Sequence, residues 1–406
     1  MSESVSDLPS CVAQHRPTWR AFLELGFRPL YLAGCLWAAI SVAAWTYAPQ
    51  SLVGILPGVM WHAHEMLWAF IATIAVGFLL TASNAWTGIN PLCGWPLGAL
   101  TALWLLARLG YLTQGATGFW FAAACEVVFF AWAAAALGRV IHAAHSRRNY
   151  GIPMLVAALG IADALYLLAA WRGDYLLLLE RFNTGLLCMA VIALLIARRV
   201  IPFFAMRAIA DLQIPMLTRS GHWQLGAGVV AIFTGLLHLQ TLAALALTVA
   251  GSIALAQVLA WRPWAVRHKP ILWILYAGYA ALAVGLLVAA GHSMGWIVRT
   301  AWPAHVIGVA GFSVLIIGMV TRTALGHLGR PLQTDRSMVI SYVLVIAAAV
   351  LRLLALLPSD SSLTALHFSA GVWILGFALY LWRFAPMMIR PRADAPETSL
   401  PATANK

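Results

Sequence analysis

Residues 61–80 read WHAHEMLWAFIATIAVGFLL, and from Leu67 onward this stretch is wholly apolar apart from one threonine. Apolar runs of about 20 residues cross a bilayer as helices, and such runs recur along nearly the whole chain. Of the 406 residues, 62% are hydrophobic and 9% are charged, and the mean hydropathy is +0.86. A soluble domain carries about 25% charged residues. The chain is therefore expected to be an all-α, polytopic transmembrane bundle.

The hydropathy pattern predicts about twelve membrane helices, with no convincing internal repeat and with the sixth helix broken at Pro202. A cytoplasmic N-terminal tail (1–29), an integral membrane domain (30–386) and a disordered cytoplasmic C-terminal tail (387–406) are expected. The predicted spans are 30–48, 64–84, 96–113, 118–140, 152–171, 184–204, 222–241, 243–261, 270–291, 300–321, 337–357 and 365–385.

The basic residues predict that both termini are cytoplasmic. With that orientation, only Arg172, Arg181 and Arg299 fall in outer segments, and Arg108 and Arg352 fall within helices; every other Lys and Arg lies on the inner side. This is a strong positive-inside bias. The net charge of +12 therefore serves orientation and contact with anionic lipid, and no nucleic-acid partner is expected.

The same orientation sorts the twelve histidines into two groups. Histidine at the edge of a membrane bundle is costly and tends to face its interior, and it is a common ligand of metals and haem iron. His62 and His64 are two residues apart on one helix, so their side chains should point about 200° apart. Glu65 beside them is expected to orient an imidazole or to carry protons. The outer group is His62, His64, His238, His292, His305 and His367.

A second candidate region lies at the inner membrane edge, in the stretch TRTALGHLGRPL that contains His327. Arg322 and Arg330 flank this histidine, and Arg28 precedes the first helix. Arginines bind carboxylates and phosphates in bidentate fashion, so haem propionates and lipid phosphates are both candidate ligands. A merely orienting inner loop is the alternative. On the outer side, Arg352 lies at a depth comparable to His305 and could hold a propionate.

Charged residues inside the spans are the third signal. Arg108 and Glu126 lie at depths that differ by roughly 5 Å at 1.5 Å per residue, so a buried pair is predicted. Asp163 also falls within a span. Intramembrane charges of this kind are either structural pairs or part of a proton path.

Six stretches of the sequence, among them those that contain WHAHEM and TRTALGHLGRPL, resemble the NnrS family, and the resemblance runs over nearly the whole chain. It implies a bacterial inner-membrane protein of twelve helices that contains haem and copper and acts in nitric oxide metabolism and nitrosative-stress resistance. The histidines that match are His62, His64, His305 and His327. The matching stretches are GFRPLYL, WHAHEMLWAFIATIAVGFLLTASNAWTG, RVIPFF, ILWILYAGYA, HVIGVAGFSVLIIGMVTRTALGHLGRPL and RFAPMMIRPRAD.

One position departs from this resemblance: Tyr276 stands where many members carry a histidine in the ninth helix. The chain has no C-x-x-C-H motif, so haem of the b type is expected rather than covalent c-type haem. Copper, where it binds, is expected to take imidazole ligands, because the cysteines and methionines form no cluster.

Three functions remain open on this evidence. The first is redox chemistry on nitric oxide, as a reductase or another oxidoreductase, with an electron donor that the sequence does not identify. The second is ion-coupled secondary transport, which twelve helices and buried charges would also suit. The third is a non-catalytic sensor that binds nitric oxide without turning it over.

Overall fold

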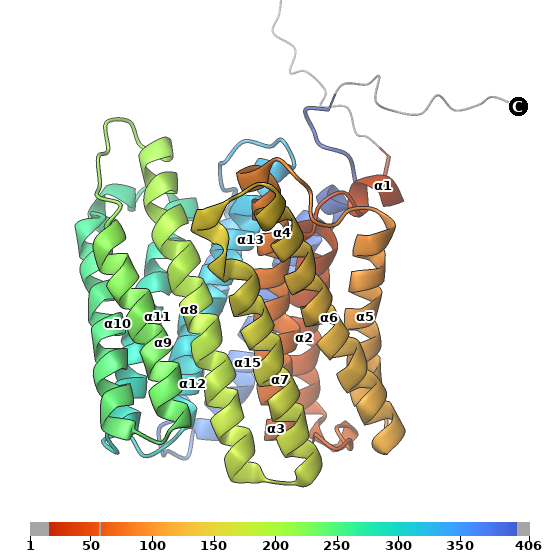
Figure 1. Ribbon diagram of the computed structural model, residues 1–406, viewed down its shortest axis with the longest axis vertical. Coiled ribbons are helices and arrows are strands. Elements are labelled where there is room, and N and C mark those ends of the chain that lie inside the picture. The colour runs from red at the N-terminus through yellow and green to blue at the C-terminus, as the bar shows by residue number, and fades with distance from the viewer. Residues whose placement is uncertain (1–15, 57, 396–406) are drawn as a thin grey trace, which may run out of the picture.

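The computed structural model describes residues 16–56 and 58–395, and every regular element within those ranges is a helix (Figure 1). The outermost parts of the two predicted tails, residues 1–15 and 396–406, lie outside the described residues. The prediction of an all-helical membrane bundle is confirmed.

Among the described residues, a helix is present at each of the twelve predicted spans. Short helices lie in or next to the connections: α1 (Trp19–Phe22), η1 (Pro49–Ser51), η3 (Arg147–Asn149) and η4 (Pro263–Val266). Two of the twelve are composite: α3, η2 and α4 (Val59–His64, Glu65–Ala72, Thr73–Thr87) form the second, and α12, η5 and α13 (Ala301–His305, Val306–Ser313, Val314–His327) form the tenth. The other ten are α2 (Phe27–Tyr47), α5 (Trp95–Tyr111), α6 (Ala116–Ala143), α7 (Gly151–Arg172), α8 (Tyr175–Ala208), α9 (Thr218–Leu236), α10 (Gln240–Ala260), α11 (Pro270–Ser293), α14 (Arg336–Leu354) and α15 (Ser362–Met388). Ten of the twelve are long and apolar enough to cross a membrane, and α5 and α9 are the exceptions.

Helix α8 differs most from its prediction. It begins at Tyr175, because the Asp174 side chain caps it by accepting a hydrogen bond from the Leu177 N–H (3.0 Å). The predicted break at Pro202 is wrong, since the helix continues through that proline to Ala208. Arg181, expected in an outer segment, lies in the first turns of α8.

The first and last membrane helices are neighbours in the bundle. Helix α15 packs on α2, and the Trp373 indole N–H donates to the Ala38 carbonyl across that contact (2.9 Å). The Thr18 N–H donates to the Ile389 carbonyl (3.0 Å), so the described chain ends meet at one end of the bundle, uppermost in Figure 1. An even number of crossings accounts for this meeting, and we call this end the inner end because the basic residues gather there.

The second membrane helix is the most enclosed element of the bundle. Of its most apolar window, 89% is buried within the protein, against 28% for α15. Close approach to its neighbours requires small residues: a Cβ at Gly185 of α8 would lie 2.5 Å from the Trp68 ring. The residues of WHAHEM are thus held in protein rather than facing lipid.

The second and tenth helices share a tetrapeptide pattern and the same local backbone geometry. Each has a W-x-A-H tetrapeptide, at 61–64 and 302–305, and in each an eight-residue π-helical segment begins directly after its last histidine. π-Helical segments are rare and are frequent at functional sites. At the end of both segments a hydroxyl donates to the carbonyl five residues before it: Thr73 to Trp68 (3.2 Å) and Ser313 to Gly308 (3.0 Å). The segments η2 and η5 pack against each other, so both wide turns meet in the bundle interior.

Candidate functional site

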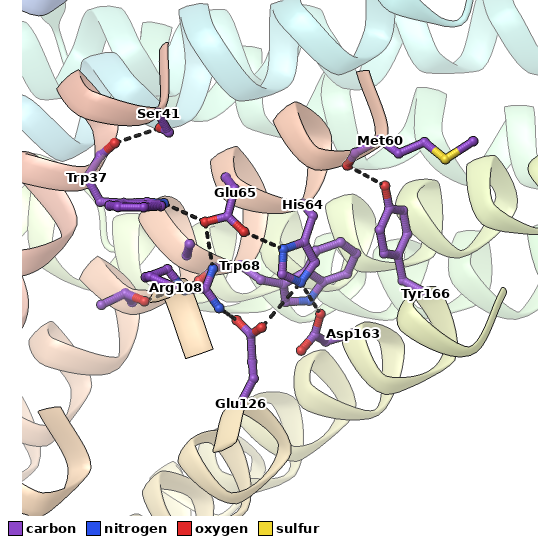
Figure 2. Close-up of polar contacts among 12 residues, drawn as sticks. Trp37, Ser41, Met60, His64, Glu65, Trp68, Arg108, Glu126, Asp163 and Tyr166 are labelled. Carbon is purple, nitrogen blue, oxygen red and sulfur yellow. Dashed lines mark hydrogen bonds and ion pairs between the residues drawn. The ribbon is translucent and has the colours of Figure 1, made fainter. Parts of the chain in front are cut away.

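The two histidines of helix α3 enter different surroundings, as their spacing predicts. His62 faces an outer cavity that lies against η2 and η5, whereas His64 points into a cluster of charged side chains (Figure 2). We call the first region the outer cavity and the second the buried charge cluster. The cluster consists of His64, Glu65, Arg108, Glu126 and Asp163.

The outer cavity has a volume of about 190 Å³ and mostly apolar walls. Its cationic or imidazole side chains, among the described residues that line it, are His62, His305 and Arg352. These three come from α3, α12 and α14, elements far apart in the sequence. Met66 and Phe182 are among the apolar residues of its wall. The arrangement is typical of a cofactor pocket, in which few polar groups converge within an apolar enclosure.

His305 is held in the form that a metal ligand needs. Its Nδ1 lies 2.7 Å from the Ala301 carbonyl, an acceptor only, so Nδ1 carries the hydrogen and donates. The other ring nitrogen, Nε2, is then the one with a free lone pair. A ligating histidine commonly bonds a backbone carbonyl in this way through its second nitrogen.

His62 is oriented by stacking rather than by a hydrogen bond. Its ring lies parallel to the Trp45 ring, with centroids 4.1 Å apart and an interplanar angle of 18°. Its Nδ1 is buried and has no hydrogen-bond partner among the described residues. A buried imidazole nitrogen without a partner is uncommon and calls for a ligand, a water or an ion.

Arg352 gives the outer cavity its positive charge. Its guanidinium lies 6.0 Å from the centre of the Trp45 ring, which His62 also stacks on. No carboxylate of the described residues lies within 4 Å of this guanidinium. An anionic group entering the outer cavity would therefore meet an uncommitted cation.

The donors fit a haem, whereas the volume fits it less well. Two imidazoles can ligate iron and a guanidinium can bind a propionate. The cavity, however, is smaller than the ~300–1,000 Å³ of typical cofactor pockets. A macrocycle would have to displace wall side chains such as Met66, a flexible residue type. A diatomic molecule fits the cavity as it stands.

The buried charge cluster differs from the outer cavity in that its charged side chains contact one another directly. His64 Nδ1 lies 2.8 Å from Glu65 Oε1, and its Nε2 lies 3.0 Å from Asp163 Oδ1 and 3.3 Å from Glu126 Oε2. The Arg108 guanidinium bridges Glu65 Oε2 (2.9 Å) and Glu126 Oε1 (2.5 Å) (Figure 2). These five side chains are 0–2% exposed. The predicted Arg108–Glu126 pair is confirmed.

Two aromatic residues that the sequence analysis did not single out complete the buried charge cluster. The Trp37 indole N–H donates to Glu65 Oε2 (2.5 Å). The Tyr166 ring stacks on the His64 ring, with centroids 5.8 Å apart, and Tyr166 also lines the outer cavity. Tyr166 is therefore the direct physical link between the two regions.

The inner-end residues that were predicted as a second cofactor region lie far from the outer cavity. His327 is the last residue of the composite helix that begins at Ala301, and 22 residues at about 1.5 Å each separate it from His305 by roughly 33 Å. Its ring lies against Phe27, with centroids 5.7 Å apart. A macrocycle in the outer cavity cannot reach His327, so any role for it in cofactor binding requires a second site.

The three inner arginines make separate contacts. Arg28 donates to the Met388 carbonyl (2.9 Å) and the Arg390 carbonyl (2.6 Å), which ties the start of α2 to the end of α15. Arg322 lies over the Phe204 ring, 3.8 Å from its centre. Arg330 follows α13, and its backbone N–H donates to the Leu325 carbonyl (3.0 Å). A cofactor role for these three stays a prediction.

Tyr276, at the position where many relatives were expected to carry histidine, donates its hydroxyl to the Trp261 carbonyl (3.1 Å). It does not belong to the lining of the outer cavity. The histidines that line that cavity are therefore unaffected by this departure.

Comparison with known families agrees with this architecture. The model of the family described as "NnrS protein" matches residues 21–392, which is nearly the whole chain. No curated protein matches the chain.

Proposed function

The chain belongs to the NnrS family, which is linked to the response to nitric oxide, and from that premise we propose a haem-binding membrane protein that acts on nitric oxide in its outer cavity. The observation that carries the proposal is the convergence of His62, His305 and Arg352 on one apolar enclosure. We place the protein in the bacterial inner membrane, with the outer cavity facing away from the cytoplasm.

Each residue of the outer cavity has a role in this proposal. His62 and His305 would hold the iron, and the carbonyl of Ala301 accepts the hydrogen of His305 Nδ1, which leaves Nε2 free to serve as the ligand. Arg352 would bind a propionate. Haem, when bound, would supply an iron that exchanges electrons and that binds nitric oxide in place of one of the two imidazoles. Copper, if this protein takes it, would compete for the same two imidazoles.

The apolar wall has two further effects on a bound haem. It excludes water, which strengthens the interaction between Arg352 and an anionic propionate. It also admits nitric oxide, a small and weakly polar molecule that dissolves in lipid. Glu65 does not line this cavity, and we therefore assign it to holding His64 rather than to delivering protons to substrate.

Ion-coupled transport is the weaker candidate. The charges that favoured it, Arg108, Glu126 and Asp163, are bound to one another or to His64 within a single cluster. None of the described residues that line the outer cavity offers a carboxylate that could carry a coupling ion. A sensor that binds nitric oxide without turnover would use the same cavity, and only turnover distinguishes it from an enzyme.

The test is a spectrum of the detergent-purified protein before and after addition of nitric oxide. We expect a Soret band in wild type that shifts on addition of nitric oxide, and loss of that band in His305→Ala. His238→Ala is the matched control, because His238 is also at the outer end but its side chain is 71% exposed. Absence of a Soret band from wild type purified from haem-replete cells would refute the proposal. Consumption of nitric oxide with an artificial electron donor would separate an enzyme from a sensor.

A further inference from the structure

The buried charge cluster carries an imbalance of charge that its hydrogen bonds do not remove. The cluster holds three carboxylates, those of Glu65, Glu126 and Asp163, and one guanidinium, that of Arg108, which pairs with Glu65 and Glu126. With a neutral His64, the fully buried cluster carries two uncompensated negative charges. Burial of unpaired charge is strongly unfavourable, so the cluster requires further positive charge.

The imbalance is concentrated at a single point, the Nε2 atom of His64. Because Glu65 accepts the hydrogen of Nδ1, a neutral ring presents a lone pair at Nε2. This lone pair faces Asp163 Oδ1 at 3.0 Å and Glu126 Oε2 at 3.3 Å, so three electron-pair donors converge. The three ligand atoms offered by these residues lie within 4.8 Å of one another.

Unpartnered atoms at the same place point to a ligand. Asp163 Oδ2 and Glu126 Oε2 are buried and have no hydrogen-bond partner among the described residues. Their residues are 0% and 2% exposed. Buried carboxylate oxygens normally find a donor or a cation, and two that lack one in the same cluster are exceptional.

We propose that His64, Glu126 and Asp163 bind one divalent first-row transition-metal ion of the manganese, iron or zinc type. Two carboxylates match its charge, and one imidazole with two carboxylates suits these ions better than copper(I). Glu65 then acts as the outer partner that orients the ligating imidazole, a common arrangement around metal-bound histidine. The ligands come from α3, α6 and α7, so the ion joins three membrane helices.

This metal site is distinct from the outer cavity and does not rest on the proposed haem. None of its three ligands lines the cavity, and Tyr166 stands between the two regions. The ion would hold α3 from the side opposite His62, and so fix the backbone that presents His62 to the cavity.

The first test is the metal content of protein purified from cells supplied with manganese, iron and zinc, with haem iron measured separately and subtracted. We expect about one such ion per chain in wild type, and content at least about tenfold lower in Glu126→Gln and Asp163→Asn. Both variants keep the side-chain shape and remove one negative charge. His62→Ala is the matched control on the same helix and should keep its metal.

A wild-type protein without stoichiometric metal, or variants that retain it, would overturn the proposal and leave the cluster as a protonated ion-pair network. A second measurement covers the case in which the variants do not fold. Wild type stripped with a chelator is titrated with Mn²⁺ and followed by electron paramagnetic resonance. Loss of the free-ion signal until about one equivalent is bound, with release by Zn²⁺, is expected. An unchanged free-ion signal from the first addition would contradict the site.

Discussion

The outer cavity and the buried charge cluster begin two residues apart and have opposite chemistry. His62 stacks on Trp45 and leaves a ring nitrogen unpartnered beside an apolar space, whereas both ring nitrogens of His64 face carboxylates. The same residue type on the same helix thus faces an apolar space in one case and a group of carboxylates in the other. The difference teaches that the partners of a histidine, rather than its presence in a motif, decide what it can bind.

The largest difference in stability between the two regions is expected when the guanidinium of each is removed. Arg108→Met removes the guanidinium that pairs with the buried carboxylates of Glu65 and Glu126, and we expect a loss of stability of about 3–5 kcal/mol. Thermal denaturation in detergent, followed by size-exclusion chromatography, would measure it. Arg352→Met is the control, since that guanidinium pairs with no carboxylate of the described residues, and its variant should melt close to wild type. Equal losses of stability in both variants would show that the buried charge cluster does not depend on the positive charge of Arg108.

Replacement of Glu65, whose carboxylate contacts both His64 and Arg108, should have the next largest effect on stability. Glu65→Gln keeps the shape but gives His64, Arg108 and Trp37 an uncharged partner, and a cost of about 1.5–3 kcal/mol is expected. Thermal denaturation serves again, with Glu180→Gln, a half-buried outer carboxylate, as the control. A variant as stable as wild type would mean that Glu65 is protonated in the native protein and pairs with neither neighbour.

Two tryptophans sharpen the contrast between the regions. Trp37→Phe removes the N–H that bonds Glu65, and should cost about 1.5–3 kcal/mol at most without changing the Soret band. Trp45→Phe alters the ring on which His62 stacks, and should shift the Soret band with little change in melting temperature. A shift of the Soret band in Trp37→Phe and not in Trp45→Phe would mean that the haem lies beside the buried charge cluster and not in the outer cavity.

The smallest effect is expected at the inner end. His327→Ala should leave the haem content unchanged, because roughly 33 Å separates His327 from His305, and stability should change by less than about 1 kcal/mol. The pyridine haemochromogen assay gives the ratio of haem to protein. A fall to about half the wild-type ratio would instead reveal a second haem at His327, with Arg28, Arg322 and Arg330 as candidates for its propionates.

Much of the fold could be predicted from the sequence because each membrane helix is a local property. Apolar runs locate the helices, whereas the orientation inferred from the arginines stays a prediction. The exceptions have local causes that hydropathy does not register: Asp174 caps α8 earlier than predicted, and packing by neighbouring helices lets α8 continue through Pro202. The π-helical turns after His64 and His305 have no signature in hydropathy, although the repeated W-x-A-H tetrapeptide marks where both begin.

The candidate site could be predicted only in part. Spacing alone indicates that His62 and His64 face different ways, and depth alone indicates the Arg108–Glu126 pair. The contact of His64 with Asp163 joins residues 99 apart in the chain, so it depends on how helices pack and not on any local pattern. The same holds for Trp37, whose bond to Glu65 crosses between the first and second membrane helices.

The central claim is that His62, and not His64, faces the cofactor. The most direct test is the haem content per folded protein of His62→Ala beside His64→Ala, both recovered as the monodisperse fraction. We expect haem to be lost from His62→Ala and to be kept by the folded fraction of His64→Ala. Retention of haem by His62→Ala together with its loss from folded His64→Ala would contradict it.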